Sequence, residues 1–148
     1  RKMELAILLW EVGTLQAAMA GVGELALGPQ PWFLLPLGKL QLFWAPGLSL
    51  PRARIRLLEG PWFLWLDLPP PRVSLGRAPG YALVALSRGP RGPELAWELT
   101  PAPWLSLLGA FGPLPWCAVR ARTGAAWAQL TVIGGEGVLA FGVSLPGP

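Results

Sequence analysis

The side chains that perform chemistry in most enzymes are scarce in this sequence. The 148 residues include no histidine and one cysteine, Cys117. Without histidine there is no general base that changes charge near neutral pH, and no Ser–His or Cys–His pair can form. Cys117 stands between Trp116 and Ala118 in an apolar stretch, which favours a buried structural thiol. We therefore expect no catalytic residue and no enzymatic activity.

The acidic residues do not form a catalytic or metal-binding set. Glu94 and Glu98 are four apart, which on a strand places both on the same exposed face. No Cys/His ligand set is present, and the carboxylates do not cluster as a metal ion requires. The stretch Gly134-Gly135-Glu136-Gly137 lacks the Lys-Ser/Thr ending of a phosphate-binding loop. We expect no metal and no cofactor.

Arginines alternate with apolar residues between positions 52 and 57. This alternation predicts a half-buried strand that buries Ala53, Ile55 and Leu57 and exposes Arg52, Arg54 and Arg56. The exposed arginines are a candidate face for an anionic ligand. A solvent face guarded by charge accounts for them as well, and we favour that interpretation.

Tryptophan is the second residue type that could bind a ligand. The chain has nine tryptophans. Aromatic rings on a surface form platforms for sugars or single-stranded nucleic acid. Tryptophans also fill the core of a small sheet and pair across its strands, which is the interpretation that we favour.

An N-terminal helix is the first element that the sequence predicts. Its apolar residues recur at three- and four-residue steps over about residues 2–26. The stripe that packs on a partner surface is Leu5, Leu8, Val12, Leu15 and Met19. Because the periodicity is already complete at residue 1, we expect a truncated helix. An apolar segment long enough to cross a membrane would then lie upstream.

The rest of the chain reads as strands and turns. Proline and glycine recur every 8 to 15 residues from about 37 to 146, which is typical of an antiparallel sheet. We expect a surface loop at 69–80, and 104–111 as either a short helix or a packed loop. The predicted strands cover 37–45, 52–58, 62–68, 81–87, 94–100, 116–123, 126–133 and 138–145. The predicted fold is α+β, with one long helix packed on antiparallel sheet in a single domain, residues 1–148.

Composition is apolar for a globular chain, with 53% hydrophobic residues, 14% charged residues and a mean hydropathy of +0.46. The longest uncharged run, 101–119, contains three prolines and cannot form one spanning helix. The net charge of +4 is mild and gives only weak support to DNA as a partner. The lack of asparagine and the many loop prolines suggest a thermophilic source.

Three stretches carry a resemblance to a known family. The N-terminal helix resembles the second half of the long helix of type IV pilins and type II secretion pseudopilins. The stretches 38–47 and 53–60 are similar to two successive strands of the J-type minor pseudopilins. The stretch 114–120 looks like the entry to the last strands of that family.

The resemblance implies a non-enzymatic subunit that initiates or caps a type IV pilus or related filament. Such filaments serve DNA uptake (natural transformation), motility or secretion. The partners would be other minor pilins and, through an N-terminal anchor missing here, the inner membrane. The implied location is the inner membrane with a periplasmic domain, or the pilus at the cell surface.

Two other classes stay open. A carbohydrate- or nucleic-acid-binding β domain would use the tryptophans and arginines, and a coplanar, surface-exposed set of tryptophans would favour it. A viral or phage structural protein would share the apolar strands and the lack of catalytic residues, and self-assembly into a shell would distinguish it.

Overall fold

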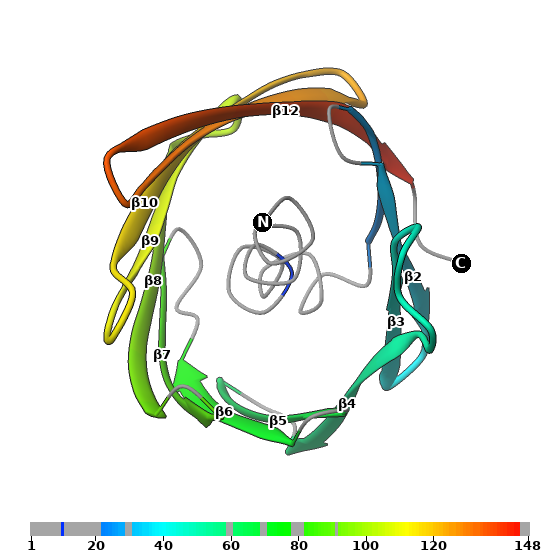
Figure 1. Cartoon of the computed structure of the whole chain (residues 1–148), viewed down its shortest axis with the longest axis vertical. Coiled ribbons are helices and arrows are strands. Elements are labelled where there is room, and N and C mark those ends of the chain that lie inside the picture. Colours follow the sequence, from blue (N-terminus) through cyan, green and yellow to red (C-terminus); the bar gives the residue numbers. More distant parts are fainter. Residues whose placement is uncertain are drawn as a thin grey trace.

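The computed structural model describes residue 10 and residues 22–28, 31–58, 61–68, 71–77, 82–90 and 92–145. Its elements are twelve β-strands that form one sheet closed on itself as a barrel (Figure 1). The strands are β1 (Gly23–Gly28), β2 (Trp32–Leu37), β3 (Leu40–Trp44), β4 (Arg52–Leu58), β5 (Trp62–Leu68), β6 (Arg72–Arg77), β7 (Ala82–Gly89), β8 (Gly92–Ala102), β9 (Leu105–Phe111), β10 (Trp116–Thr123), β11 (Ala126–Ile133) and β12 (Glu136–Leu145).

Each strand pairs antiparallel with its neighbours in sequence, and β12 pairs antiparallel with β1 to close the ring. Glycines with positive φ make the tightest turns, including Gly124 between β10 and β11 and Gly134 and Gly135 between β11 and β12. The meander leaves no open sheet edge, because closure pairs the first strand with the last. With an even number of strands, β1 begins and β12 ends at the same end of the barrel.

The two faces of the barrel wall differ sharply in polarity. Successive side chains of a strand point to opposite faces, so each strand has one inward and one outward set. In the described strands, the outward-facing side chains with a charge or a hydroxyl group are Arg77, Arg88 and Thr123, which lie at or next to a strand end. The other outward polar atoms of these strands are the indole nitrogens of Trp44, Trp62 and Trp97 and the thiol of Cys117. Exposed outward side chains of the wall include Leu27, Phe33, Leu35, Leu37, Val73, Leu75, Val84, Leu86, Leu95, Leu99, Val119, Leu130, Val132, Leu139 and Phe141.

Aromatic rings lie over glycines on neighbouring strands at three places. Phe63 stands opposite Gly76, and a Cβ atom at Gly76 would come within 2.6 Å of the Phe63 ring. Trp97 covers Gly109 in the same way on the outer face, and Trp127 covers Gly142 on the inner face. The missing Cβ lets each ring lie close to the partner strand.

The α+β prediction is wrong, and so is the pilin resemblance, because the described elements form a closed barrel of strands rather than a helix on a sheet. The helix predicted over about 2–26 runs into β1, which begins at Gly23. The stripe Leu5, Leu8, Val12, Leu15 and Met19 lies outside the described residues.

The stretches that carried the resemblance have a simpler explanation. The stretch 38–47 is a turn followed by β3, 53–60 covers most of β4, and 114–120 leads into β10. Short apolar strands separated by glycine and proline recur in any antiparallel meander, so these motifs do not distinguish a pilin sheet from a barrel wall. The predicted loop at 69–80 is also wrong in part, since β6 occupies 72–77.

Candidate functional site

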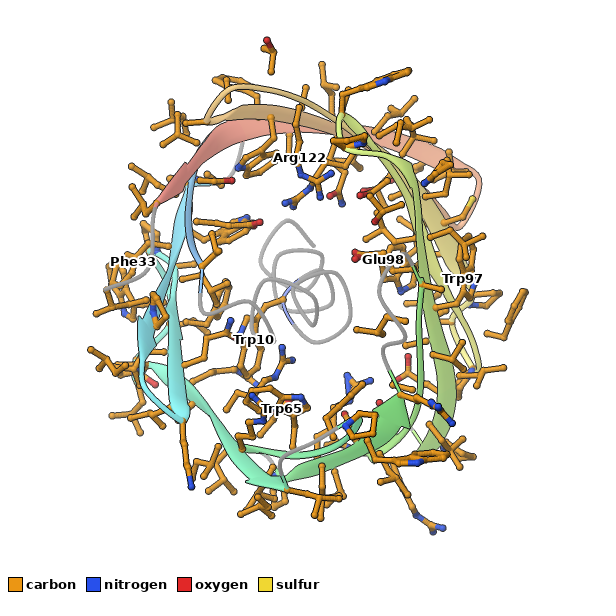
Figure 2. The ribbon with its side chains drawn as sticks, turned by 180° about the vertical axis from the view of Figure 1, so that it is seen from behind. Trp10, Phe33, Trp65, Trp97, Glu98 and Arg122 are labelled. Atoms are coloured by element: carbon orange, nitrogen blue, oxygen red, sulfur yellow. The ribbon has the colours of Figure 1, made fainter. Side chains whose placement is uncertain are left out.

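The interior of the barrel collects nearly all the charged side chains of the strands. Figure 2 shows Glu98 and Arg122 pointing inward, whereas Phe33 and Trp97 point away from the barrel. Arg54, Asp67 and Arg72 are at most 2% exposed. Charged groups are rarely buried to this degree unless they are paired, so each needs a partner inside.

The first interior cluster centres on Arg54. Its guanidinium forms two hydrogen bonds to the Asp67 carboxylate, Nε to Oδ1 at 2.9 Å and Nη2 to Oδ2 at 3.2 Å. The strands β4 and β5 place the two residues directly opposite each other. Arg54 also donates to the side-chain oxygen of Gln41 at 3.4 Å and to the backbone carbonyl of Trp10 at 3.1 Å. This two-bond geometry is the strong form of an arginine–carboxylate pair.

Trp10 belongs to no strand, yet its side chain lies inside the barrel (Figure 2) and is 1% exposed. Its ring stacks on Phe43 with centroids 5.2 Å apart, and the Arg54 guanidinium lies 4.8 Å from its centroid. The interior therefore has room for a side chain in addition to those of the wall. A barrel of twelve strands is wider than the eight-stranded barrels whose own side chains fill them.

The second cluster centres on Arg120 of β10. Its Nη1 donates to Glu24 of β1 at 2.5 Å, and its Nε donates to Gln129 of β11 at 2.8 Å. The guanidinium also lies 4.2 Å from the ring centroid of Trp127. Gln129 in turn donates to Thr131 at 3.2 Å. The ion pair joins residues that are 96 positions apart and links β10 to β1 across the two strands that lie between them, β11 and β12.

Arg122 and Glu98 lie beside this cluster without forming an ion pair with each other. Arg122 donates to the Ser106 hydroxyl at 2.8 Å, and Ser106 lies 3.3 Å from the Thr100 hydroxyl. Glu98 is 6% exposed, and its Oε2 atom has no hydrogen-bond partner among the described residues. A buried carboxylate oxygen without a partner is costly, and no ion pair among the described residues offsets the burial of Glu98.

A third polar cluster lies on β6, β7 and β8. Arg72 and Glu94 approach to 3.9 Å, and the hydroxyls of Ser74 and Ser87 are hydrogen-bonded at 2.8 Å across β6 and β7. Together the three clusters hold three ion pairs and one pair of hydroxyls. Removing one member of such an ion pair leaves its partner buried and charged.

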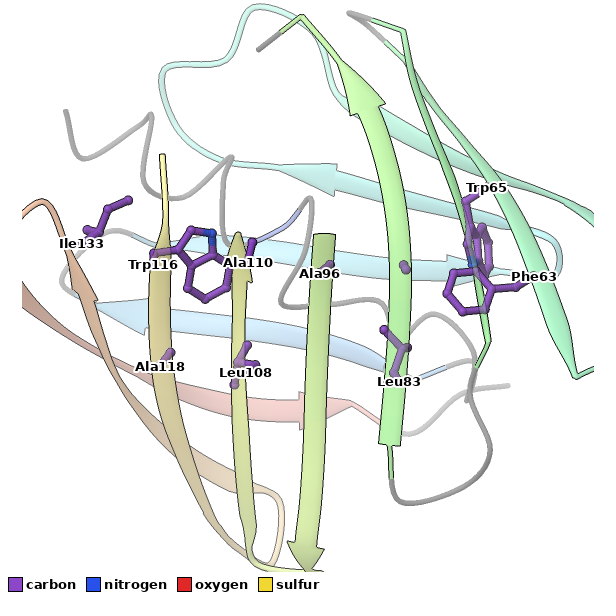
Figure 3. Close-up of a cluster of buried hydrophobic side chains, with 10 residues drawn as sticks. Phe63, Trp65, Leu83, Ala96, Leu108, Ala110, Trp116, Ala118 and Ile133 are labelled. Carbon is purple, nitrogen blue, oxygen red and sulfur yellow. The ribbon is translucent and has the colours of Figure 1, made fainter. Parts of the chain in front are cut away.

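Apolar side chains cover the remaining inner wall. Figure 3 shows one cluster on β5 and β7 to β11, which comprises Phe63, Trp65, Leu83, Ala85, Ala96, Leu108, Ala110, Trp116, Ala118 and Ile133. A second cluster comprises Trp10, Ala26, Trp32, Leu34, Phe43, Ala45 and Trp127. The inner wall thus combines polar clusters with two apolar clusters.

The arginines predicted to face solvent point the other way. Arg54 is fully buried, whereas Leu57, predicted to be buried, is 56% exposed. Arg52 stands opposite the buried Phe43 and Arg56 opposite the buried Trp65, so both face inward as well. Alternation gives the period of a strand but not which face is inside, and the prediction chose the wrong face.

Cys117 is also on the opposite face from the one expected. It is exposed on the outer face of β10 rather than buried. Among the tryptophans, Trp32, Trp65, Trp116 and Trp127 are buried inside the barrel, so they do not form a surface platform.

The sequence reasoning missed the acidic members of the interior. Glu94 and Glu98, expected on an exposed face, are 3% and 6% exposed, and Glu24 and Asp67 were assigned to no site. A signal was present in β8, where Glu94, Glu98 and Thr100 fall on one alternation phase, whereas Glu24 and Asp67 are the single charged residues of β1 and β5. In the part of the chain that the structure describes, no group of acidic or cysteine side chains suits a metal ion.

Nothing in the described residues forms a helix with the length and hydropathy of a membrane span. Comparisons of the chain with protein-family models, with curated proteins and with solved structures find no match.

Proposed function

We propose that this chain is a membrane-embedded β-barrel whose outer face contacts lipid acyl chains. The observation that carries the proposal is the inverted polarity of the wall. Sheets exposed to water bury apolar residues and expose polar ones, whereas this barrel has its polar residues inside and its apolar residues outside. A closed antiparallel barrel with an even strand number and an apolar outer band is the form that outer-membrane proteins take.

The side chains at the two ends of the outer face support the same proposal. We call the end where β1 begins and β12 ends the terminal rim, and the other end the opposite rim. Trp62, Trp104 and Arg77 are on the terminal rim, and the Arg77 guanidinium lies 5.5 Å from the Trp62 centroid. Aromatic and cationic side chains are the usual anchors at a membrane–water interface.

The opposite rim has its own aromatic side chains. Phe33 and Trp44 lie there with ring centroids 5.9 Å apart, together with Phe111 and the outward-facing Arg88. An apolar band with aromatic girdles at both ends is the arrangement expected of a lipid-facing barrel.

Strand length constrains the membrane that the barrel fits. β8 and β12 have 11 and 10 residues, close to the roughly 9–11 residues of a spanning strand. The other strands have 5 to 8 residues, so the apolar band is thin. A thin band matches a thin bilayer, and bacterial outer membranes are thinner than average.

The polar interior gives the barrel a second property. Polar and charged side chains inside a membrane barrel line a path for water and small polar solutes. We propose that the interior is such a path, narrowed by Trp10. The pilin function rested on a helix-and-sheet order that this fold does not have, and we do not carry it forward.

Folding in the presence and absence of lipid tests the lipid-facing exterior. The urea-unfolded protein is diluted into buffer alone, into short-chain phosphatidylcholine vesicles and into long-chain vesicles. We expect strand circular dichroism and co-flotation with vesicles only when lipid is present, with the short-chain vesicles more effective because the apolar band is thin. A folded, monomeric, water-soluble barrel in buffer alone would contradict the proposal.

A further inference from the structure

Three arginines of β4 form a line along one side of the interior. Arg52, Arg54 and Arg56 occupy alternate positions and all face inward, and we call them the arginine ladder. Two residues of a strand advance about 6.6 Å, so the ladder extends roughly 13 Å along β4. It is the longest run of like charge on any described strand.

The ladder is short of negative charge. Arg54 pairs with Asp67. Arg56 lies 5.8 Å from the ring centroid of Trp65, and its Nε donates to the Leu58 carbonyl at 3.3 Å. No carboxylate among the described residues forms an ion pair with Arg52 or Arg56. The ladder therefore holds three positive charges against one negative charge.

The rest of the interior is close to neutral. Arg120 pairs with Glu24, and Arg72 lies beside Glu94. Arg122 and Glu98 supply one further charge of each sign without an ion pair between them. At the inward-facing positions of the described strands, six arginines thus stand against five carboxylates, the fifth being Glu136 at the first residue of β12, and the excess positive charge lies on the ladder.

We infer that the arginine ladder makes the interior select small anions over cations, with Arg52 and Arg56 as the residues that determine the preference. The inference rests on the proposed solute path. Arg54 is bound to Asp67 and to the Trp10 carbonyl, so Arg52 and Arg56, at the two ends of the ladder, are the arginines available to a passing anion. Both are half-buried, whereas Arg54 is fully buried. Fixed guanidinium groups in a narrow polar path attract anions and repel cations.

The test is the reversal potential of currents through the purified protein in a planar lipid bilayer under a steep KCl gradient. We expect a chloride preference in the unaltered protein. The double variant Arg52→Gln/Arg56→Gln should bring the chloride-to-potassium permeability ratio down to about one. The matched control is Arg77→Gln/Arg88→Gln, which removes the same charge from the outer face at the two rims and should keep the chloride preference. Circular dichroism must show the same strand signal for both variants.

Each outcome decides between the two proposals. Loss of the chloride preference in the ladder variant alone supports the inference. A cation preference in the unaltered protein, or equal loss in both double variants, overturns the inference and leaves the solute path standing. If no current passes through the protein or through a Trp10→Ala variant, the solute path and the inference both fail. The lipid-facing exterior is then still judged by folding into vesicles.

Discussion

Trp127 of β11 and Gly142 of β12 are cross-strand partners, and the indole covers the glycine so closely that a Cβ atom there would come within 2.7 Å of its Cζ2 atom. The next strand continues the arrangement, because Ala26 of β1 stands opposite Gly142. These small residues leave room for Trp127 to reach Trp32, with ring centroids 6.0 Å apart. The contact joins β11 to β2 across the place where the barrel closes.

Substitution at this contact should loosen the closure. A methyl group at Gly142 would also lie 2.2 Å from the Leu25 carbonyl oxygen, which is backbone and cannot move aside easily. We expect Gly142→Ala to lower the free energy of unfolding by about 1–3 kcal/mol. Urea titration of the lipid-folded protein measures the change.

Gly137→Ala is the matched control on the same strand. Its nearest neighbour is the Leu130 Cδ1 atom at 3.8 Å, an ordinary contact distance, so this variant should unfold at nearly the same urea concentration as the unaltered protein. Equal effects of the two alanines would show that the packing of Trp127 on Gly142 does not stabilise the closure.

The ion pair between Arg120 and Glu24 makes a second prediction. Arg120→Met or Glu24→Met alone should cost about 3–5 kcal/mol, since each leaves a buried charge without its partner. The double variant Arg120→Met/Glu24→Met should recover much of that loss, because no unpaired charge remains. A double-mutant cycle on unfolding free energies gives the coupling, and purely additive losses would contradict the buried pair.

A charged substitution on the outer face tests whether that face contacts lipid. Leu86 is 61% exposed on β7. Leu86→Arg should make folding into vesicles less favourable by about 2–4 kcal/mol, as expected for a charge on a lipid-facing strand. The apolar control Leu86→Phe should insert nearly as well as the unaltered protein. In a water-exposed barrel the arginine would be harmless, so an unchanged insertion yield speaks against lipid contact.

The sequence predicted many strands and missed others for physical reasons. Proline and glycine punctuation located β3, β4, β5, β7, β8, β10, β11 and β12. β6 was missed because prolines flank it, and β9 because its apolar run fits a helix or a packed loop. β1 was missed because the predicted helix extended over it, and β2 because Pro31 and Pro36 interrupt its apolar run.

The facing of the strands could not be read from the pattern. Arg54 and Ile55 alternate in the same way whether the arginine faces water outside or a polar interior. The prediction assumed that apolar residues lie inside, as in a water-soluble sheet. The candidate site failed for the same reason, because Glu24 and Arg120 meet only when the barrel closes and brings residues 96 positions apart together.

The depth of single cysteines along β10 is the most direct measure of the lipid-facing exterior. Cys117 is the one cysteine of the chain, so a fluorophore can be attached there without substitution. In a Cys117→Ala background, Val119→Cys, Ala121→Cys and Thr123→Cys move the label along the same outward face. We predict that quenching by acyl-chain nitroxide lipids is strongest at 119 and 121, and that aqueous iodide quenches best at 123. Strong iodide quenching at all four positions, with none by the nitroxide lipids, would contradict the account.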